Sequence, residues 1–514
     1  MDVFDADETA LNTLWTVTHE CDSGSRQREV LPSAASLAKA RSTLVANLPS
    51  VGIGFAQVKE HIFHDITPGL NSSSVSPNYY GFVTGGVTPA ALLADNVVSA
   101  YDQNVQVHLP DHSVATDVEF AALGLLKDLF GLERDEWPHA ALTTGATASN
   151  LLGLSCGREF VLRKAAEQKT QCKATAECSV GEHGLTAVLQ TAGLRGLQVL
   201  STMSHSSLSK AAGILGIGRA NVKSISAGNS DSNQILKFDF ERLEAELCRT
   251  DMASIVAVSC GEVNTGRFAT EGLHEFQRVR ELCNRYNAWL HVDGAFGMFT
   301  RLLDDSAEFE LLKKGSEGLE LADSITGDAH KLLNVPYDCG FFFSRHGDIA
   351  ENVFQNPNAA YLSAGNKSNA LEQAPTPSPL NIGVENSRRF RALPVYATLV
   401  AYGKDGYRDM MERQISLARR IAGWLFDHPK YTVLPLCASK QECLTNTFMI
   451  VLFKANDEKG NSELTDRINA TSKIFVSGTK WQGSPASRIA ISNWKVQVER
   501  DFVRVTEVLN EAVS

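Results

Sequence analysis

The strongest architectural signal in this chain is AWLHVDGAFG at residues 288–297, an apolar run that closes on the carboxylate of Asp293 and continues into small residues. A second segment of this kind, SITGDAHKLL at 324–333, places Lys331 shortly after another apolar run. Both patterns are typical of buried β-strands, and a buried charge at a strand end is costly unless it meets a partner. The chain therefore carries candidate functional groups at the ends of its strands.

Short β-branched runs alternate with helical patterns across the middle of the chain. The expected strands lie at 197–202, 221–226, 253–260, 288–293 and 322–326, and the expected helices at 205–215, 238–247 and 271–286. This alternation indicates an α/β fold with a parallel sheet covered by helices on both faces. Such sheets bind ligands outside the carboxyl ends of their strands.

After the loop-like stretch SAGNKSNALEQAPTPSP at 363–379, the pattern changes. It predicts a long helix at 394–426, strands at 431–435 and 446–453, and a final helix beyond residue 493. We therefore predict a mostly helical N-terminal segment (1–95), a large domain (96–393) and a small C-terminal α/β domain (394–514).

Composition excludes several classes of protein. The 514 residues include 48 basic and 59 acidic side chains, a net charge of −11, which offers no electrostatic footprint for nucleic acid or anionic membranes. The ten cysteines show no CxxC pair or zinc spacing and are typical of free thiols in a reducing compartment. The acidic start lacks the pattern of a signal peptide, and no apolar run reaches membrane-spanning length. We expect a cytoplasmic protein without a metal, a nucleic-acid partner or a membrane segment.

Four segments carry candidate functional residues, and each has an ordinary alternative. The small residues of TTGATASN at 143–150 open a helix and suit a phosphate, although an N-cap has the same composition. Asp293 can cap a helix or form an ion pair, and a lone lysine such as Lys331 more often lies at the surface. His205, in STMSHSSLSKAAG at 201–213, is by itself most simply a helix cap.

Taken together, the four segments fit one cofactor, pyridoxal phosphate. This cofactor needs an amine for a Schiff base, a carboxylate for its pyridine nitrogen, a phosphate cradle and a flat partner over its ring. Lys331, Asp293, the turn at 145–147 and His205 supply these groups in that order. The combination is far more specific than any of its members.

The chain resembles the group II pyridoxal-phosphate decarboxylases, which include aromatic-amino-acid, tyrosine, histidine and glutamate decarboxylases. The resemblance rests on YYGFVTGGVTPAALLAD at 79–95, TTGATASN, SHSSLSKAA, HVDGAFG, DAHKLLNVPYDCG and SRRFRALPVYATL at 387–399. It spans roughly residues 77 to 493. The resemblance implies the fold type I architecture of the aspartate-aminotransferase group, carboxy-lyase activity on an amino acid, and a homodimer with active sites near the subunit interface.

The resemblance also implies roles for single residues. Lys331 forms the Schiff base, His205 stacks on the ring, Asp293 pairs with the pyridine nitrogen and Ala295 packs against the ring face. Gly145, Ala146 and Thr147 form the phosphate cradle. Asp328 stands where many members have the Asn of an NPHK motif, and its carboxylate would repel a phosphate unless another donor mediates.

The reaction expected from this resemblance is loss of carbon dioxide from the substrate Cα, with Lys331, His205 and His330 as catalytic groups. His205 and His330 are the candidate proton carriers. In the aromatic branch a loop tyrosine protonates Cα, but residues 363–379 contain no tyrosine; Tyr361 or a partner-subunit residue are substitutes. An amine-forming decarboxylase is the first hypothesis, an aldehyde synthase the second, and a non-catalytic scaffold the third.

The substrate is less determined. Glutamate decarboxylases place an Asn-Gln pair where this chain has Gly81 and Phe82, so Tyr79, Tyr80 and Phe82 favour an apolar substrate wall for an aromatic L-amino acid. The candidate substrate-binding residues are Tyr80, Phe82 and Thr84. The alternative is that these aromatic residues belong to the core. For the arginines, the sequence leaves two roles open, namely binding of a carboxylate and ion pairing between segments; these are Arg388, Arg389, Arg391 and Arg488.

Overall fold

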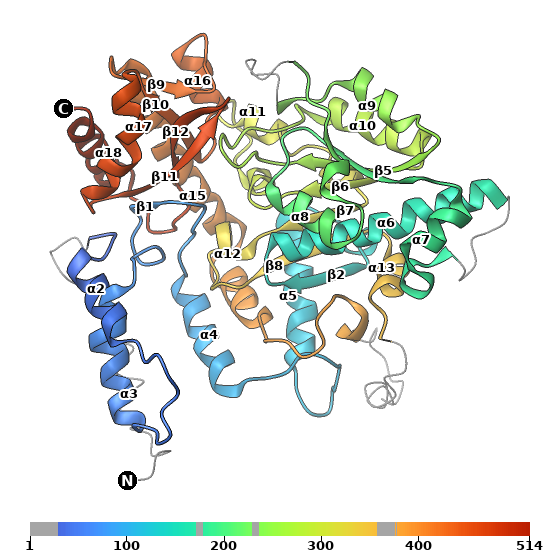
Figure 1. Cartoon of the computed structure of the whole chain (residues 1–514), viewed down its shortest axis with the longest axis horizontal. Helices are drawn as coiled ribbons and strands as arrows, with labels where there is room; N and C mark the ends of the chain where they lie inside the picture. Colours follow the sequence, from blue (N-terminus) through green and yellow to red (C-terminus); the bar gives the residue numbers. More distant parts are fainter. Residues whose placement is uncertain (1–28, 171–177, 229–235, 357–375, 377) are drawn as a thin grey trace.

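Two β-sheets organise the protein (Figure 1). The computed structural model describes residues 29–170, 178–228, 236–356, 376 and 378–514. Within these residues a seven-stranded sheet has the order β2-β8-β7-β6-β5-β3-β4, and a five-stranded sheet has the order β1-β11-β12-β10-β9. The larger sheet carries the strand ends that the sequence singled out.

The strands of the large sheet are β2 (His139–Thr143), β3 (Gly196–Ser201), β4 (Val222–Ser224), β5 (Met252–Ser259), β6 (Trp289–Asp293), β7 (Ser324–Gly327) and β8 (Gly340–Ser344). The run from β4 to β7 is parallel, whereas β8 is antiparallel to both β7 and β2. The sheet is therefore mixed, which corrects the expectation of a parallel sheet. The short helix α12 (Ala329–Leu332) joins β7 to β8 within a connection of about twelve residues, which is near the minimum for a parallel crossover.

Both faces of the large sheet are buried. Along β8, Phe341 and Phe343 belong to one core cluster and Phe342 to another, as expected when successive side chains of a strand point to opposite faces. The covering helices are α4 (Pro89–Tyr101), α5 (Ala115–Phe130), α6 (Ala146–Thr170), α7 (Val180–Ala192), α8 (Ser206–Ile214), α9 (Phe240–Leu247), α10 (Leu273–Arg285), α11 (Glu310–Lys314) and α13 (Gly347–Phe354). The prediction that helices cover both faces is confirmed.

The small sheet contains β9 (Tyr431–Leu434), β10 (Ile450–Ala455), β11 (Phe475–Trp481) and β12 (Ser484–Ala490), with helices α15 (Ala392–Asp427), α16 (Lys440–Asn446), α17 (Glu458–Ala470) and α18 (Val498–Ala512). Its fifth strand, β1 (Tyr79–Tyr80), comes from the N-terminal part of the chain and pairs in parallel with β11. The C-terminal sheet is thus completed by an early segment. The division into three domains stays a prediction, but its two boundaries, after residues 95 and 393, fall inside helices α4 and α15.

The first described helices, α2 (Ala34–Thr43) and α3 (Phe55–His61), extend away from the rest of the molecule (Figure 1). Neither helix contains a buried residue. Large apolar side chains between and beside them face solvent, and Leu48 and Val51 are 97% and 77% exposed. In the described part of the chain, no helix is long and apolar enough to span a membrane.

Candidate active site

A cavity of about 220 Å³ lies at the edge of the large sheet where the parallel strands end. Residues 144–148, at the start of α6, form one wall. His205, Asp293, Ala295 and Lys331 line the rest of it, together with Asp328 and His330. The structure therefore brings into one cavity the residues of all four sequence segments.

Lys331 lies on α12, directly after β7, and its amine is paired with a buried carboxylate. Its Nζ is 2.8 Å from Oδ2 of Asp328, and the side chains of the two residues are 21% and 5% exposed. The Lys331 Nζ also lies 5.6 Å from the centroid of the Phe296 ring. The alternative that Lys331 is an ordinary surface lysine is therefore wrong, because Lys331 lines the cavity and its amine is paired with a buried carboxylate.

Asp328 connects the lysine to the start of α6. Its Oδ1 accepts a hydrogen bond from the backbone N–H of Ala146 at 2.5 Å. Burial acts to raise the pKa of Asp328, but the charges of Lys331 and His330 and the two hydrogen bonds outweigh it and lower the pKa below its usual value. The carboxylate is therefore charged at neutral pH and compensated by its neighbours.

Asp293 ends β6, and its carboxylate is held by a residue of α6. Oδ2 accepts a hydrogen bond from Nδ2 of Asn150 at 3.0 Å, and Oδ1 accepts one from the backbone N–H of Ala295 at 3.3 Å. The Oδ1 atom of Asn150 lies 2.8 Å from Nε2 of His291. Burial lowers the pKa of His291 to about 4, so this ring is neutral and donates to Asn150. The chain from His291 through Asn150 fixes the orientation of the Asp293 carboxylate.

Comparison with known proteins places this arrangement in a family. A family model described as the pyridoxal-dependent decarboxylase conserved domain matches residues 41–444. This chain belongs to the pyridoxal-dependent decarboxylase family. The carboxy-lyases of this family use pyridoxal phosphate, so the cofactor and the class of enzyme inferred from the sequence are confirmed.

Three relatives show how broad the family is. The chain is 26% identical to L-2,4-diaminobutyrate decarboxylase of Acinetobacter baumannii over 65% of this chain and 60% of that protein. It is 24% identical to 3,4-dihydroxyphenylacetaldehyde synthase of Aedes aegypti over 92% of this chain and 83% of that protein. The crystal structure of Oryza sativa TDC with PLP and tryptamine has a TM-score of 0.77 at 20% identity, covering 100% of this chain and 99% of that chain. The last comparison shows the fold, and the prediction of fold type I is confirmed.

The cavity of this decarboxylase fits pyridoxal phosphate. Residues 144–148 present the N-terminus of α6, which favours a phosphate. A Cβ atom at Gly145 would lie 3.1 Å from the His330 ring and 3.3 Å from Asp328, so this turn has no room for a larger residue. Asp293 and Lys331 lie in the same cavity as this turn. When bound, the cofactor supplies an electron sink for a bond broken at the substrate Cα.

Both predicted histidines line the cavity of the decarboxylase. His205 is the N-cap of α8; its Nδ1 accepts from the backbone N–H of Ser207 at 3.2 Å, so a neutral ring carries its proton on Nε2. The Nδ1 atom of His330 accepts from the backbone N–H of Cys339 at 3.4 Å, which leaves Nε2 directed to Asp328 at 3.5 Å. Burial lowers the pKa of His330. Each ring can therefore present an N–H at Nε2.

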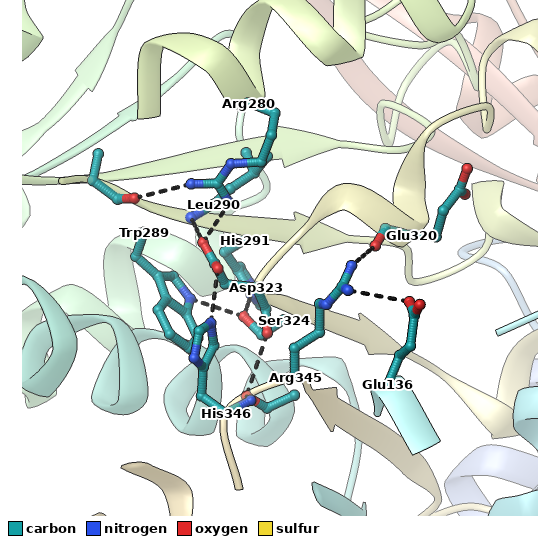
Figure 2. A network of polar contacts seen from close by, with 12 residues as sticks. Glu136, Arg280, Trp289, Leu290, His291, Glu320, Asp323, Ser324, Arg345 and His346 are labelled. Carbon is teal, nitrogen blue, oxygen red and sulfur yellow. Dashed lines mark hydrogen bonds and ion pairs between the residues drawn. The ribbon is translucent and has the colours of Figure 1, made fainter. Parts of the chain in front are cut away.

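The two strands that lead to Asp293 and Lys331, β6 and β7, are joined at their amino ends by Asp323 (Figure 2). Its Oδ2 accepts from the backbone N–H of Leu290 at 2.7 Å and from Nη1 of Arg280 at 2.8 Å, and its Oδ1 lies 2.9 Å from Nε2 of His346. Burial acts to raise the pKa of Asp323, but the bonds from His346 and Arg280 outweigh it and lower the pKa. This network fixes the register of β6 against β7 behind the active site.

The predicted substrate wall is only partly placed at the site. Tyr80 is 1% exposed in the core of the small domain, and its hydroxyl accepts from Nδ2 of Asn78 at 3.0 Å. The prediction that Tyr80 contacts substrate is therefore wrong, and its core alternative holds. Thr84 is also buried and donates to the carbonyl of Gly81 at 3.4 Å, outside the lining of the cavity. Phe82, by contrast, is 68% exposed.

The three arginines of SRRFR are bound by carboxylates of the protein itself. Their partners are Glu119 for Arg388, Asp95 for Arg389, and both Asp338 and Glu385 for Arg391. Arg388 forms two hydrogen bonds, at 2.7 and 2.6 Å, to Glu119 on α5. Of the two roles that the sequence left open, ion pairing between segments applies to these arginines.

Arg488, on β12, forms no ion pair with a carboxylate in the described part of the chain, although the charge of Glu262 acts on it. Its Nε donates to the carbonyl of Val263 at 2.7 Å and its Nη1 to the carbonyl of Phe82 at 3.1 Å. Within the described residues its Nη2 is buried and has no hydrogen-bond partner. Val263 lines the active-site cavity, whereas Arg488 contacts that lining only through the Val263 carbonyl.

Sequence reasoning assigned no role to Asn150 or Tyr337. Asn150 was visible in TTGATASN, where its place one helical turn after Ala146 directs it along the same face of α6. The ring of Tyr337 lies against that of His330 with centroids 4.4 Å apart, and this tyrosine is 61% exposed. No sequence pattern marks Tyr337, because its position depends on the turn between α12 and β8. Tyr361 and most of the loop at 363–379 lie outside the described residues.

Proposed function

We propose that this protein decarboxylates an L-amino acid, preferably an aromatic one, and releases carbon dioxide and the corresponding amine. The observation that supports this most is the single cavity that joins the Lys331–Asp328 pair to the Asp293–Asn150 pair. Asp293 is suited to keep a cationic ring nitrogen protonated, and Lys331 is suited to provide the amine that binds the cofactor aldehyde. His205 and Nε2 of His330 are placed to move protons at the cavity wall.

The free Nη2 of Arg488 supports binding of the substrate carboxylate. A buried guanidinium donor without a partner costs free energy, and a carboxylate is the acceptor that best satisfies it. Burial lowers the pKa of Arg488 to about 10, which still leaves the side chain cationic at neutral pH. Nη2 is buried, and within the described residues Arg488 reaches the cavity wall only at Val263. Our proposal is therefore that Arg488 orients the group that leaves as carbon dioxide once the turn at Val263 moves aside.

Aromatic side chains near the cavity support an apolar substrate. Phe82 and Tyr337 are exposed, the backbone carbonyl of Phe82 binds Arg488, and Tyr337 contacts His330. Burial and, to a lesser degree, the nearby phenol of Tyr337 raise the pKa of Tyr79. Exposed aromatic rings beside a polar site suit a substrate with a flat apolar side chain.

The second candidate is an aldehyde synthase, which couples decarboxylation to oxidative deamination. The sequence supports it because residues 363–379 lack a tyrosine that could protonate Cα, so oxygen can intercept the carbanion. The likeness to the Aedes aegypti aldehyde synthase is compatible with either product.

One experiment separates these functions. The purified, cofactor-loaded protein is given a panel of L-amino acids, including aromatic, diamino and acidic ones, while carbon dioxide and oxygen are measured together. An amine-forming enzyme releases carbon dioxide without oxygen uptake, whereas an aldehyde synthase consumes oxygen and yields ammonia and peroxide. A scaffold shows neither activity, and its visible absorbance is the same in Lys331→Ala. The aromatic proposal is rejected if aromatic amino acids are the poorest substrates.

We further propose that the protein is a homodimer. The arm formed by α2 and α3 exposes Leu44, Val45, Leu48, Val51 and Ile53, and isolated apolar clusters of this kind mark protein interfaces. Light scattering on the full chain is expected to give twice the mass of one chain, and Leu48→Ser with Val51→Ser to shift it toward monomer. Monomeric behaviour of the unaltered protein refutes the proposal.

A cytoplasmic location is proposed on the state of the thiols. Apart from Cys178, the seven cysteines in the described part of the chain are free thiols, as expected in a reducing compartment. Fractionation of cells that produce the protein with its own termini tests this directly.

A further inference from the structure

A pair of thiols lies at the start of α16, far along the chain from the active-site residues. Cys437 is two residues before the N-cap, Ser439, and Cys443 is the fourth residue of the helix. Ser439 Oγ accepts from the backbone N–H of Glu442 at 3.1 Å, and Oε2 of Glu442 accepts from the backbone N–H of Ala438 at 2.7 Å. This reciprocal capping fixes the turn that carries Cys437 over the first turn of the helix.

The two thiols interact with each other and with a cation. Cys443 is 2% exposed in the small-domain core, and Cys437 packs half-buried against the same cluster, close enough for each thiol to affect the pKa of the other. Nη2 of Arg267 donates a hydrogen bond to Sγ of Cys437 at 3.2 Å. Such a thiol, with a neighbouring thiol and a guanidinium, has the surroundings of a reactive cysteine.

The charges around Cys437 favour its thiolate. The interaction with the Cys443 thiol, followed by the charge of Arg267, lowers the pKa of Cys437 to about 6. Burial opposes this shift, and so does the charge of Glu442. The same interaction and burial raise the pKa of Cys443, which therefore keeps its proton. By contrast, burial raises the pKa of four other core thiols, those of Cys156, Cys260, Cys283 and Cys339.

We propose that Cys437 and Cys443 are a site of reversible oxidation to an intramolecular disulfide, with a hydroperoxide as the oxidant. The Cys437 thiolate attacks one peroxide oxygen, the O–O bond breaks, and the sulfur becomes a sulfenic acid as water leaves. The Cys443 thiol then attacks that sulfur, the S–S bond forms, and a second water leaves. The two sulfurs together lose two electrons and two protons, and hydrogen peroxide is reduced to two waters.

This site is attached to the wall of the active-site cavity. Arg267 closes a turn in which the backbone N–H of Glu262 donates to the Arg267 carbonyl at 2.7 Å, and Val263 of that turn lines the cavity. Oxidation replaces the anionic acceptor of Arg267 by a neutral disulfide. The thiol pair is therefore linked to the active site through one arginine and one turn.

The test uses the full-length, cofactor-loaded protein, treated with a small molar excess of hydrogen peroxide, alkylated and digested with trypsin. Lys440 separates the two cysteines, so the disulfide joins the peptides YTVLPLCASK (431–440) and QECLTNTFMIVLFK (441–454). We expect this linked pair to appear and to separate on reduction. Absence of the linked pair while the exposed Cys248 is oxidised overturns the proposal.

Variants distinguish a reactive pair from a merely accessible thiol. Cys443→Ser should abolish the linked pair and leave a sulfenic acid on Cys437 that dimedone traps. Arg267→Met should raise the pH midpoint for alkylation of Cys437 by about one unit or more, with alkylation of Cys248 unchanged. Unchanged circular dichroism shows that each variant is folded. Equal dimedone labelling of Cys248 and Cys437 in Cys443→Ser refutes the assignment of Cys437 as the reactive thiol.

Discussion

Replacement of Arg488 by methionine is expected to weaken recognition of the amino-acid carboxylate. Within the described residues Nη2 of Arg488 is buried without a hydrogen-bond partner, and Nε of the same side chain donates to Val263 in the cavity wall. A hydrogen bond between charged groups contributes about 1.5–3 kcal/mol, so its loss should lower kcat/KM by about 10- to 150-fold. Methionine has a similar volume and little polarity, which limits the effect to the guanidinium.

The assay compares two ligands that differ only in the carboxylate. The amino-acid substrate is followed by kcat/KM, and its product amine by its inhibition constant. The amine has no carboxylate, so its inhibition constant should change by less than about threefold, well under 1 kcal/mol. If the variant weakens inhibition by the amine as much as it lowers kcat/KM for the amino acid, Arg488 acts only through the cavity wall, and the reasoning fails.

Arg388→Met is the matched control. Arg388 and Glu119 are 4% and 3% exposed and form a bidentate pair, so removal of one partner should cost about 3–5 kcal/mol of the free energy of unfolding in urea. The KM for the amino acid should not change, because this arginine already binds a carboxylate of the protein. A raised KM without loss of stability would restore the substrate-binding alternative for SRRFR.

Three further changes test other parts of the site. Asp293→Asn should lower carbon dioxide release by at least about a hundredfold while the cofactor's visible absorbance persists; activity within tenfold of the native protein contradicts the assigned role. The pKa of Asp323 is lowered in the folded protein, so its contribution to stability is present above the unfolded pKa of about 3.9 and is lost as pH falls through the folded pKa. Asp323→Asn should therefore lose less stability than the native protein between about pH 5 and pH 3, as measured by urea unfolding, and an equal loss contradicts this. Tyr337→Phe removes the phenol beside His330 and should raise the oxygen consumed per carbon dioxide released; an unchanged ratio excludes Tyr337 as a proton donor.

The sequence predicts the site well where function depends on strand ends. Asp293 ends β6 and Lys331 follows β7, and neighbouring parallel strands bring their carboxyl ends together. Any residue placed at those ends is therefore near the others, whatever the details of the loops. The cavity lined by Asp293, Lys331 and His205 follows from this geometry alone.

The direction of a strand, and the contacts that the N-terminal segment makes with residues far along the chain, could not be predicted in this way. Apolar periodicity marks a buried strand but carries no information on its direction. No strand was expected at 340–344, so neither β8 nor its reversal was predicted. Tyr80 illustrates the same limit for side chains. Its place in β1, paired with β11, depends on residues almost 400 positions later, and that pairing turns it into the small-domain core.

Asn150 shows why supporting residues escape a motif search. Its type is common at helix starts, so the local sequence explains it as a cap. Its function appears only when α6 packs on the large sheet and its amide meets Asp293 and His291. Residues that orient a catalytic group act through tertiary contacts, and their signal in one sequence is correspondingly weak.

The acidic chain binds an anionic cofactor by local compensation of charge. A carboxylate at position 328, next to the phosphate cradle, appears unfavourable at first, since like charges repel. Asp328 is nevertheless bound on one side by the Ala146 N–H and on the other by Lys331, so its charge is directed at donors within the protein. The remaining N–H groups at the start of α6 and its helix dipole are then left for the phosphate. Asp328 thus orders Lys331 and the phosphate cradle together. An asparagine at this position has a single acceptor oxygen and lacks the charge that holds the lysine amine.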